Sequence, residues 1–295
     1  MGGDLRQTLQ SHLPLSFGVS GALGSRLYTS SDIGRLIAIA RDEGISIFDT
    51  SPSYGAGVAE TRLGRAIGNC PNAFVMTKAG LRSSGLAKRE RDHSPEGIVE
   101  SVEGSLRRLK RDRIDLLWLH GPDKTELTDE LLGALNRLQR TGKVVALGIT
   151  SRDPSLSPFA SEAPFSAYMS PANPYSVPAA KTDSDVVHFG IECFANVRPT
   201  TNVQMGRSSL WKAAKSLIRG KPERNGDMSA KEAFDFAFNA ANCDIVLTTT
   251  TKPSRIRENR ALVSEFVHAP SVKTLTSLAR NPAPVAAEAP ILTMT

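Results

Sequence analysis

Short apolar runs alternate with longer amphipathic stretches along nearly the whole chain. An apolar run of a few residues is typical of a buried strand, whereas apolar residues at helical spacing predict an amphipathic helix. On this basis we expect eight strands: Leu13–Val19, Ile45–Asp49, Ala73–Thr77, Ile114–His120, Val144–Ile149, Phe165–Met169, His188–Ala195 and Asp244–Thr248.

Helical spacing fills the intervals between these strands. The clearest helices are expected at Ser31–Asp42, Ser94–Leu109, Glu130–Arg140, Ala230–Ala241 and Pro253–Val267. Ser94-Pro95 is a strong start signal, because serine caps a helix and proline suits its first position. Eight strand-then-helix units predict an α/β fold, with a parallel sheet closed into a (β/α)8 TIM barrel that forms a single domain over residues 1–280.

An open, doubly wound sheet is the alternative fold. That fold usually begins with GxGxxG after its first strand, but the nearest match, Gly55–Glu60, follows the second strand and ends in glutamate. Residues 281–295 are rich in Ala and Pro and are expected to form a flexible tail. The stretch 195–228 has seven Lys or Arg against two acidic residues, and it is either a solvated loop or a lid over an anionic ligand.

Composition narrows the class of protein. The 295-residue chain has a formal net charge of +6, which suits anionic ligands, but the basic stretch offers only Trp211 for stacking on bases, so nucleic acid is not expected. Three cysteines without a CxxC pattern predict reduced thiols, and the histidine spacing predicts no metal site. Without an apolar run of membrane-spanning length or a signal peptide, we expect a cytoplasmic protein that binds no membrane. The oligomeric state stays open.

Polar residues at the ends of three adjacent predicted strands are the candidate chemistry. Asp49, Lys78 and His120 follow these strands, and Tyr54 lies five positions beyond Asp49. Each alone has an ordinary explanation, as a turn cap, a surface lysine, a core histidine or a packed tyrosine. Because the active site of such a barrel lies at the carboxyl ends of its strands, the four together predict a catalytic site.

The chemistry of this set is coherent. An ammonium group against a phenol stabilises the phenolate, so Lys78 would make Tyr54 a usable general acid, typically worth about 10²–10⁴-fold in rate. Asp49 would hold Lys78 charged and fixed, and a neutral His120 would orient a carbonyl oxygen. What is missing is an evident nucleophile or a metal, and a proton donor without either suits hydride transfer from a cofactor to a carbonyl.

Four blocks of sequence, in order, resemble the aldo-keto reductase superfamily. They are GISIFDTSPSYG with Glu60 and Leu63-Gly64, SLRRL through IDL to HGPD at 105–123, GKVVALGITS at 142–151, and RIREN at 255–259. The resemblance implies an NAD(P)H-dependent oxidoreductase that reduces an aldehyde, ketone or sugar carbonyl, or oxidises the corresponding alcohol. Asp49, Tyr54, Lys78 and His120 match the catalytic tetrad, with Tyr54 as the proton donor.

The resemblance also implies where the dinucleotide binds. The matching cofactor-binding positions are Thr150, Ser151, Met169, Phe194, Thr250, Lys252, Arg255, Glu258 and Asn259. Phe194 either stacks on the nicotinamide or is a core residue that ends the seventh strand. The helix start at Pro253 offers unpaired N–H groups to an anion, and Arg255 suits a 2′-phosphate, so NADPH is favoured over NADH.

The chain departs from the family pattern at the nicotinamide. Thr150-Ser151 stands for an expected Ser-Asn pair and Met169 for an expected glutamine, which removes amide hydrogen bonds worth about 1 kcal/mol each. Two other functions stay open. One is a non-catalytic NADP(H)-binding regulatory subunit on the same barrel. The other is a lyase or isomerase for phosphorylated sugars with Lys78 as Schiff-base nucleophile, which leaves Asp49 and Tyr54 without a role.

Overall fold

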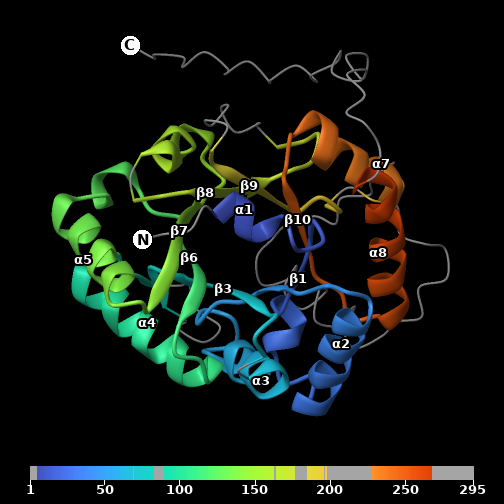
Figure 1. Cartoon of the computed structure of the whole chain (residues 1–295), viewed down its shortest axis with the longest axis horizontal. Helices are drawn as coiled ribbons and strands as arrows, with labels where there is room; N and C mark the ends of the chain where they lie inside the picture. Colours follow the sequence, from blue (N-terminus) through green and yellow to red (C-terminus); the bar gives the residue numbers. More distant parts are fainter. Residues whose placement is uncertain are drawn as a thin grey trace, which may run out of the picture.

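The computed structural model describes residues 5–68, 70–82, 90–162, 164–176, 185–195, 197 and 228–267. Eight parallel strands form a closed barrel in the order β1-β10-β9-β8-β7-β6-β3-β2 (Figure 1). They are β1 (Leu15–Gly18), β2 (Ile47–Asp49), β3 (Phe74–Ala79), β6 (Ile114–His120), β7 (Val144–Thr150), β8 (Ala167–Pro171), β9 (Val187–Ile191) and β10 (Ile245–Thr248). The predicted eight strands and the (β/α)8 barrel are confirmed.

Helices surround the barrel. They are α2 (Ser30–Asp42), α3 (Val58–Ile67), α4 (Pro95–Leu109), α5 (Asp129–Arg140), α7 (Ala230–Asp235) and α8 (Pro253–Val267). Ser94 caps α4 as the sequence predicted, accepting from the Gly97 backbone N–H at 3.1 Å. A π-helical turn, Phe236–Ala240, continues α7 to nearly the predicted length. Helix α3, which carries Glu60, was not among the predicted helices.

The connection after β7 differs from the expected strand-then-helix unit. Its described residues form two short 3₁₀ turns, η3 (Pro154–Leu156) and η4 (Pro158–Ser161), in place of an α-helix. Prolines at 154, 158 and 164 break any helix that starts here, because each removes a backbone donor and fixes φ. Leu156 and Ala160 still bury their side chains against the outer face of the barrel.

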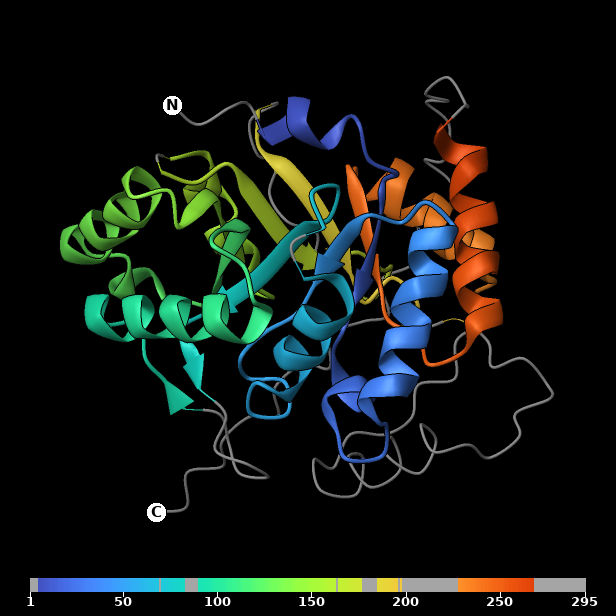
Figure 2. The same cartoon turned by 60° about the horizontal axis from the view of Figure 1, so that its bottom comes forward.

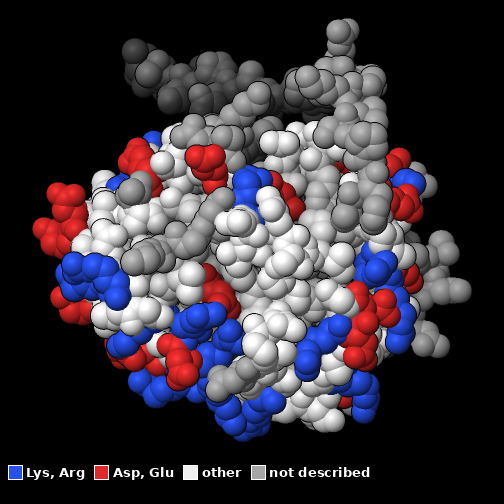
Figure 3. All heavy atoms as spheres, viewed as in Figure 1, with Lys and Arg blue, Asp and Glu red and all other residues white. Residues whose placement is uncertain are grey.

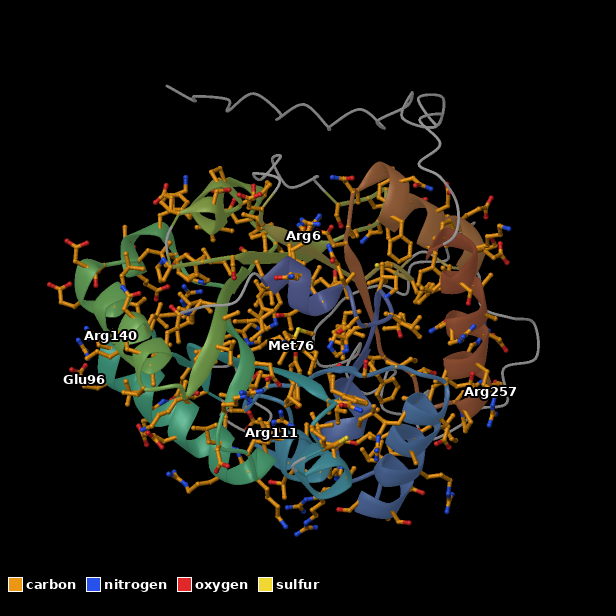
Figure 4. The ribbon with its side chains drawn as sticks, viewed as in Figure 1. Arg6, Met76, Glu96, Arg111, Arg140 and Arg257 are labelled. Atoms are coloured by element: carbon orange, nitrogen blue, oxygen red, sulfur yellow. The ribbon has the colours of Figure 1, made fainter. Side chains whose placement is uncertain are left out.

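The barrel interior is filled with large side chains. Met76 lies inside the ring of strands (Figure 4), in a cluster with Trp118, Met169 and Phe189. The Trp118 and Phe189 rings meet edge to face, with centroids 5.1 Å apart. Gly148 makes room for the indole, since a Cβ there would lie 2.4 Å from it. The interior is therefore a packed core, and chemistry is confined to its ends.

Helix α1 (Leu5–Leu9) covers the amino-terminal end of the barrel (Figures 1 and 2). Its two buried leucines join the interior cluster, and Arg6 forms an ion pair with Asp244 at 2.5 Å. Acidic and basic side chains lie together around the rim of this face (Figure 3). Opposite α1, the short hairpin of β4 (Leu81–Arg82) and β5 (Glu90–Arg91) projects from the carboxyl-terminal end. Within the described residues, no helix has the length and apolar character to cross a membrane.

Candidate active site

The carboxyl ends of three neighbouring strands bring the predicted polar residues together. Asp49 ends β2, Lys78 is the penultimate residue of β3, and His120 ends β6. These strands are adjacent in the barrel, so their side chains meet at the end opposite α1. Thr150 ends the next strand, β7, in register with His120.

Lys78 and Asp49 form a buried ion pair. Lys78 Nζ donates to both Asp49 carboxylate oxygens at 2.5 Å and to the Thr50 carbonyl at 2.9 Å. The two residues are 3% and 1% exposed. Burial opposes the charge on Lys78, but the charge of Asp49 and the hydrogen bonds with Asp49 and Tyr54 outweigh it and raise the pKa of Lys78. Lys78 therefore stays protonated at neutral pH.

Tyr54 contacts both Lys78 and His120. Lys78 Nζ lies 5.3 Å from the Tyr54 ring centroid and hydrogen-bonds to its side chain. A protonated lysine has only donors, so the phenol oxygen accepts this bond. The half-buried Tyr54 ring also meets the His120 ring edge to face, with centroids 6.4 Å apart. A phenol placed between an ammonium group and an imidazole can donate a proton to an oxygen atom bound beside it.

A short, tightly bonded loop positions Tyr54. Its backbone N–H donates to the Ser51 carbonyl at 3.0 Å, and Thr50 Oγ1 donates to the Val19 carbonyl at 3.2 Å. The three residues after Tyr54 all have positive φ, at 63° for Gly55, 52° for Ala56 and 84° for Gly57. Glycine adopts this conformation without penalty, which explains Gly55 and Gly57 at the turn into α3.

A second buried carboxylate lies behind the strand that carries Lys78. Glu60 is fully buried; it accepts from Thr77 Oγ1 at 2.6 Å, and Arg108 Nε lies 2.6 Å from its other oxygen. In the sequence, Glu60 stands out only as part of a motif, without a predicted structural role. An acidic residue between Ala59 and Leu63 on the apolar face of a helix was the signal available.

The predicted nicotinamide positions fall at the end of β7 and in the middle of β8. Thr150 is 5% exposed and Ser151 follows it, with Ser151 Oγ accepting from the Asp153 backbone N–H at 3.0 Å. Met169 is 1% exposed and belongs to the interior cluster. Asn173, just beyond β8, donates to the Glu192 carbonyl at 3.3 Å.

Phe194 lies outside the strand, in a cluster of aromatic side chains. Its ring packs edge to face on Phe234 of α7, with centroids 5.1 Å apart. At the end of β9 the interior cluster instead contains Ile191. The alternation of Val187, Phe189 and Ile191 in the sequence indicates which residues of β9 face the interior, because every second residue of a strand faces the same side.

An ion pair between Arg152 and Glu192 lies at the ends of β7 and β9, and the sequence gave no sign of it.

The predicted phosphate-binding residues lie in the connection after β10 (Thr250, Lys252) and in the first two turns of α8 (Arg255, Glu258, Asn259). Thr250 Oγ1 accepts from the Lys252 backbone N–H at 3.1 Å, and Asn259 is 6% exposed. Arg255 Nη1 lies 2.8 Å from Glu258, with the arginine side chain 30% exposed. The first turn of α8 contains no acidic residue, so this helix start is compatible with an anion.

Two sequence predictions fall outside the described residues. Most of the basic stretch 195–228, with all seven of its Lys and Arg residues, lies there, as does the tail 281–295. Within the described part of the chain, His, Cys, Asp and Glu form no group of three or more that could hold a metal ion.

The chain is similar in sequence to a known protein family and to several of its members. The model of the aldo/keto reductase family matches residues 14–192. A D-threo-aldose 1-dehydrogenase of a Pseudomonas species is 36% identical over 150 residues, in a match that covers 43% of this chain and 46% of that protein. A probable voltage-gated potassium channel β subunit of Oryza sativa subsp. japonica is 31% identical over 124 residues, 41% of this chain and 38% of that one. The matched segments thus span less than half the length of these relatives.

The solved structure of an aldo-keto reductase from Bacillus halodurans, in its holo form, has the same fold. It superposes with a TM-score of 0.65 at 22% identity, covering 88% of each chain. The family match includes β1 to β9 and the strand ends that hold Asp49, Lys78 and His120. Through this match and this fold, the chain belongs to the aldo/keto reductase family.

Proposed function

We propose that the protein is an NADPH-linked oxidoreductase that interconverts a carbonyl and its alcohol, on an aldehyde, a ketone or a sugar. The contact of Lys78 with both Asp49 and the Tyr54 phenol carries the proposal, because it supplies a positioned acid without a nucleophile. The sugar class is supported by the relationship to a D-threo-aldose 1-dehydrogenase.

In this proposal Tyr54 gives its proton to the carbonyl oxygen of the substrate. Lys78 stabilises the phenolate that remains, and Asp49 holds the ammonium group in place. His120, which lies at the edge of the Tyr54 ring, donates to the same carbonyl oxygen and orients it. When bound, the nicotinamide supplies the hydride that reduces the carbonyl carbon.

The residues around the barrel end fit a dinucleotide. Thr150 and Ser151 offer hydroxyls near the Tyr54 site, and Met169, Phe194 and Asn259 would form part of the surrounding pocket. Thr250, Lys252, Arg255 and Glu258 would hold the adenosine end at the α8 start, where the absence of acidic residues from the first turn suits a phosphate. The guanidinium of Arg255 favours NADPH over NADH, because it can bind the additional 2′-phosphate.

Turnover with a panel of carbonyl compounds tests the proposal. We expect NADPH oxidation with at least one small aldehyde, ketone or sugar, and a loss of about 10²–10⁴-fold in kcat for Tyr54→Phe with NADPH binding retained. Tyr175→Phe is the matched control, since Tyr175 is 62% exposed and lies beyond β8. Wild-type kcat in Tyr54→Phe would overturn the assignment of the acid.

A non-catalytic NADP(H)-binding regulatory subunit is the second candidate. The burial of Met169 where an amide was expected supports it, as does the relationship to a potassium channel β subunit. It predicts tight NADPH binding without turnover across the whole panel, and robust turnover would exclude it. A cytoplasmic location and binding to small molecules without nucleic acid or membrane remain predictions under either candidate.

A further inference from the structure

The guanidinium of Arg62 binds the backbone of the segment that follows β1. Arg62 lies on α3, is 9% exposed, and donates to the carbonyls of Leu23 and Ser25 at 2.5 and 2.9 Å and to that of Tyr28 at 2.5 Å. Within the described residues, its hydrogen-bond acceptors are these three main-chain carbonyls. We name residues 20–28 the first loop; it follows β1 at the same end of the barrel as Tyr54.

The first loop in turn packs directly on the peptide that follows Tyr54. A Cβ placed on Gly55 would lie 1.9 Å from the Gly24 carbonyl oxygen, and a Cβ on Gly24 would lie 3.1 Å from the Tyr54 carbonyl group. Leu23 and Ser25, two of the residues that bind Arg62, are the immediate neighbours of Gly24. The guanidinium therefore holds the loop at the point where it touches the Tyr54 backbone.

These contacts form a closed circuit that starts and ends at the Tyr54 backbone. Residues 50–57, which carry Tyr54 and which we name the tyrosine loop, lead into α3, where the Ala59 backbone N–H donates to the Tyr54 carbonyl at 3.3 Å. Helix α3 carries Arg62, Arg62 holds the first loop, and the first loop packs back on Gly55. Lys78, by contrast, lies on β3, where Asp49 at the end of β2 and the Thr50 carbonyl hold its ammonium group. The distance between the phenol and the ammonium group thus depends on how the tyrosine loop is seated.

We propose that Arg62 is a positioning residue for Tyr54, acting through the first loop, and this inference rests on the proposed function. When Arg62 is removed, the first loop loses three hydrogen bonds to α3 and Tyr54 is held less firmly against Lys78. A displacement of about 1 Å at a reacting group can cost about 10²-fold in rate, so a small shift of the loop has a large effect on turnover.

Kinetics of Arg62→Ala test the proposal, with Arg65→Ala as the matched control. Arg65 lies on the same helix, is exposed and contacts Ser30 Oγ at 3.4 Å. We expect Arg62→Ala to lower kcat by about 10- to 100-fold per folded enzyme, with the NADPH Kd within about twofold of wild type. Guanidinium ion, added below denaturing concentrations, should restore part of kcat. A purely structural role would change thermal stability and the folded fraction but not kcat per folded enzyme.

Gly24→Ala provides a second test that leaves Arg62 in place. The new methyl group presses on the Tyr54 carbonyl, so kcat should fall without rescue by guanidinium. Gly34→Ala on α2 is its control, because a Cβ there meets no atom within 4 Å. If Arg62→Ala does not fold, the kcat of Gly24→Ala decides whether the first loop positions Tyr54.

The outcomes separate this inference from the proposed function. Wild-type kcat in both Arg62→Ala and Gly24→Ala, alongside a large loss in Tyr54→Phe, overturns the positioning role only. Wild-type kcat in Tyr54→Phe overturns the proposed function itself.

Discussion

Glu60 and Arg108 form an ion pair directly behind the strand that carries Lys78, with Arg108 Nε 2.6 Å from Glu60 Oε2. The carboxylate also accepts from Thr77, the residue before Lys78. Removing the Glu60 carboxylate leaves the Thr77 hydroxyl and the Arg108 guanidinium without their hydrogen-bond acceptor. Glu60→Ala should therefore lower the free energy of unfolding by about 2–3 kcal/mol, measured in urea.

The control for that prediction is Glu103→Ala. Glu103 pairs with Lys143 in a partly exposed position, and such pairs contribute about 0–1 kcal/mol. Equal losses in Glu60→Ala and Glu103→Ala would contradict a special contribution from the buried pair.

The Lys78–Asp49 pair predicts non-additive effects on stability. Lys78→Met alone leaves the Asp49 carboxylate buried without its counter-charge and should cost about 3–5 kcal/mol. The double variant Lys78→Met/Asp49→Asn should recover much of this loss while remaining inactive. Chemical denaturation of Lys78→Met, Asp49→Asn and the double variant measures the coupling, and strictly additive losses would argue against the ion pair.

Ala56 offers a site for stabilisation. It has φ of 52°, a conformation that costs an L-residue roughly 1–2 kcal/mol and glycine almost nothing. Ala56→Gly should therefore raise the free energy of unfolding by about 1 kcal/mol. Ala66→Gly, in the last turn of α3, should lower it by roughly 0.5–1 kcal/mol. Opposite signs in the two thermal melts are the expected result, and a loss in both would contradict it.

His93 makes stability sensitive to acid. Burial lowers the pKa of His93, an effect that the neighbouring Glu126 only partly offsets. Below about pH 6.5 the unfolded chain then binds more protons than the folded one, so the free energy of unfolding falls as the pH is lowered. His93→Gln should reduce this slope between about pH 5 and 7. The slope that remains is expected from His12 and His188, whose pKa values burial also lowers.

Arg255 should determine the preference between cofactors. Arg255→Met removes the guanidinium proposed to bind the 2′-phosphate, and we expect the Kd of NADPH to rise about tenfold while that of NADH changes little. Arg257→Met is the control, because Arg257 lies on the outer side of α8 and pairs with Glu43 at 3.2 Å (Figure 4). Parallel weakening of both cofactors in Arg255→Met would count against a phosphate contact.

Much of the fold was predictable because its signals are local. Ile114–His120 and Pro253–Val267 were predicted at their observed bounds, since an uninterrupted apolar run and a proline start each mark an element without reference to the rest of the chain. The connection after β7 was less predictable, because prolines exclude a helix without specifying what replaces it.

The candidate site, too, was predictable only where its signals are local. Asp49, Lys78 and His120 could be placed at one end of the barrel because each follows a recognisable strand. The three carbonyls that bind Arg62 could not be foreseen, since they depend on how a loop folds back on a distant helix. The position of Phe194 could not be predicted, because a shift of one residue in the end of a strand decides whether a side chain points into the barrel or out of it. In the structure its ring packs on Phe234 of α7.

The closure of the barrel has a consequence for synthesis in the cell. Strand β1 pairs on one side with β2, but its other partner is β10, which is translated last among the eight strands. A nascent chain on the ribosome must therefore keep the open edge of β1 unpaired until Ile245–Thr248 emerge. During that interval the edge is exposed to pairing with other chains, and a chaperone that shields it would raise the yield of folded protein.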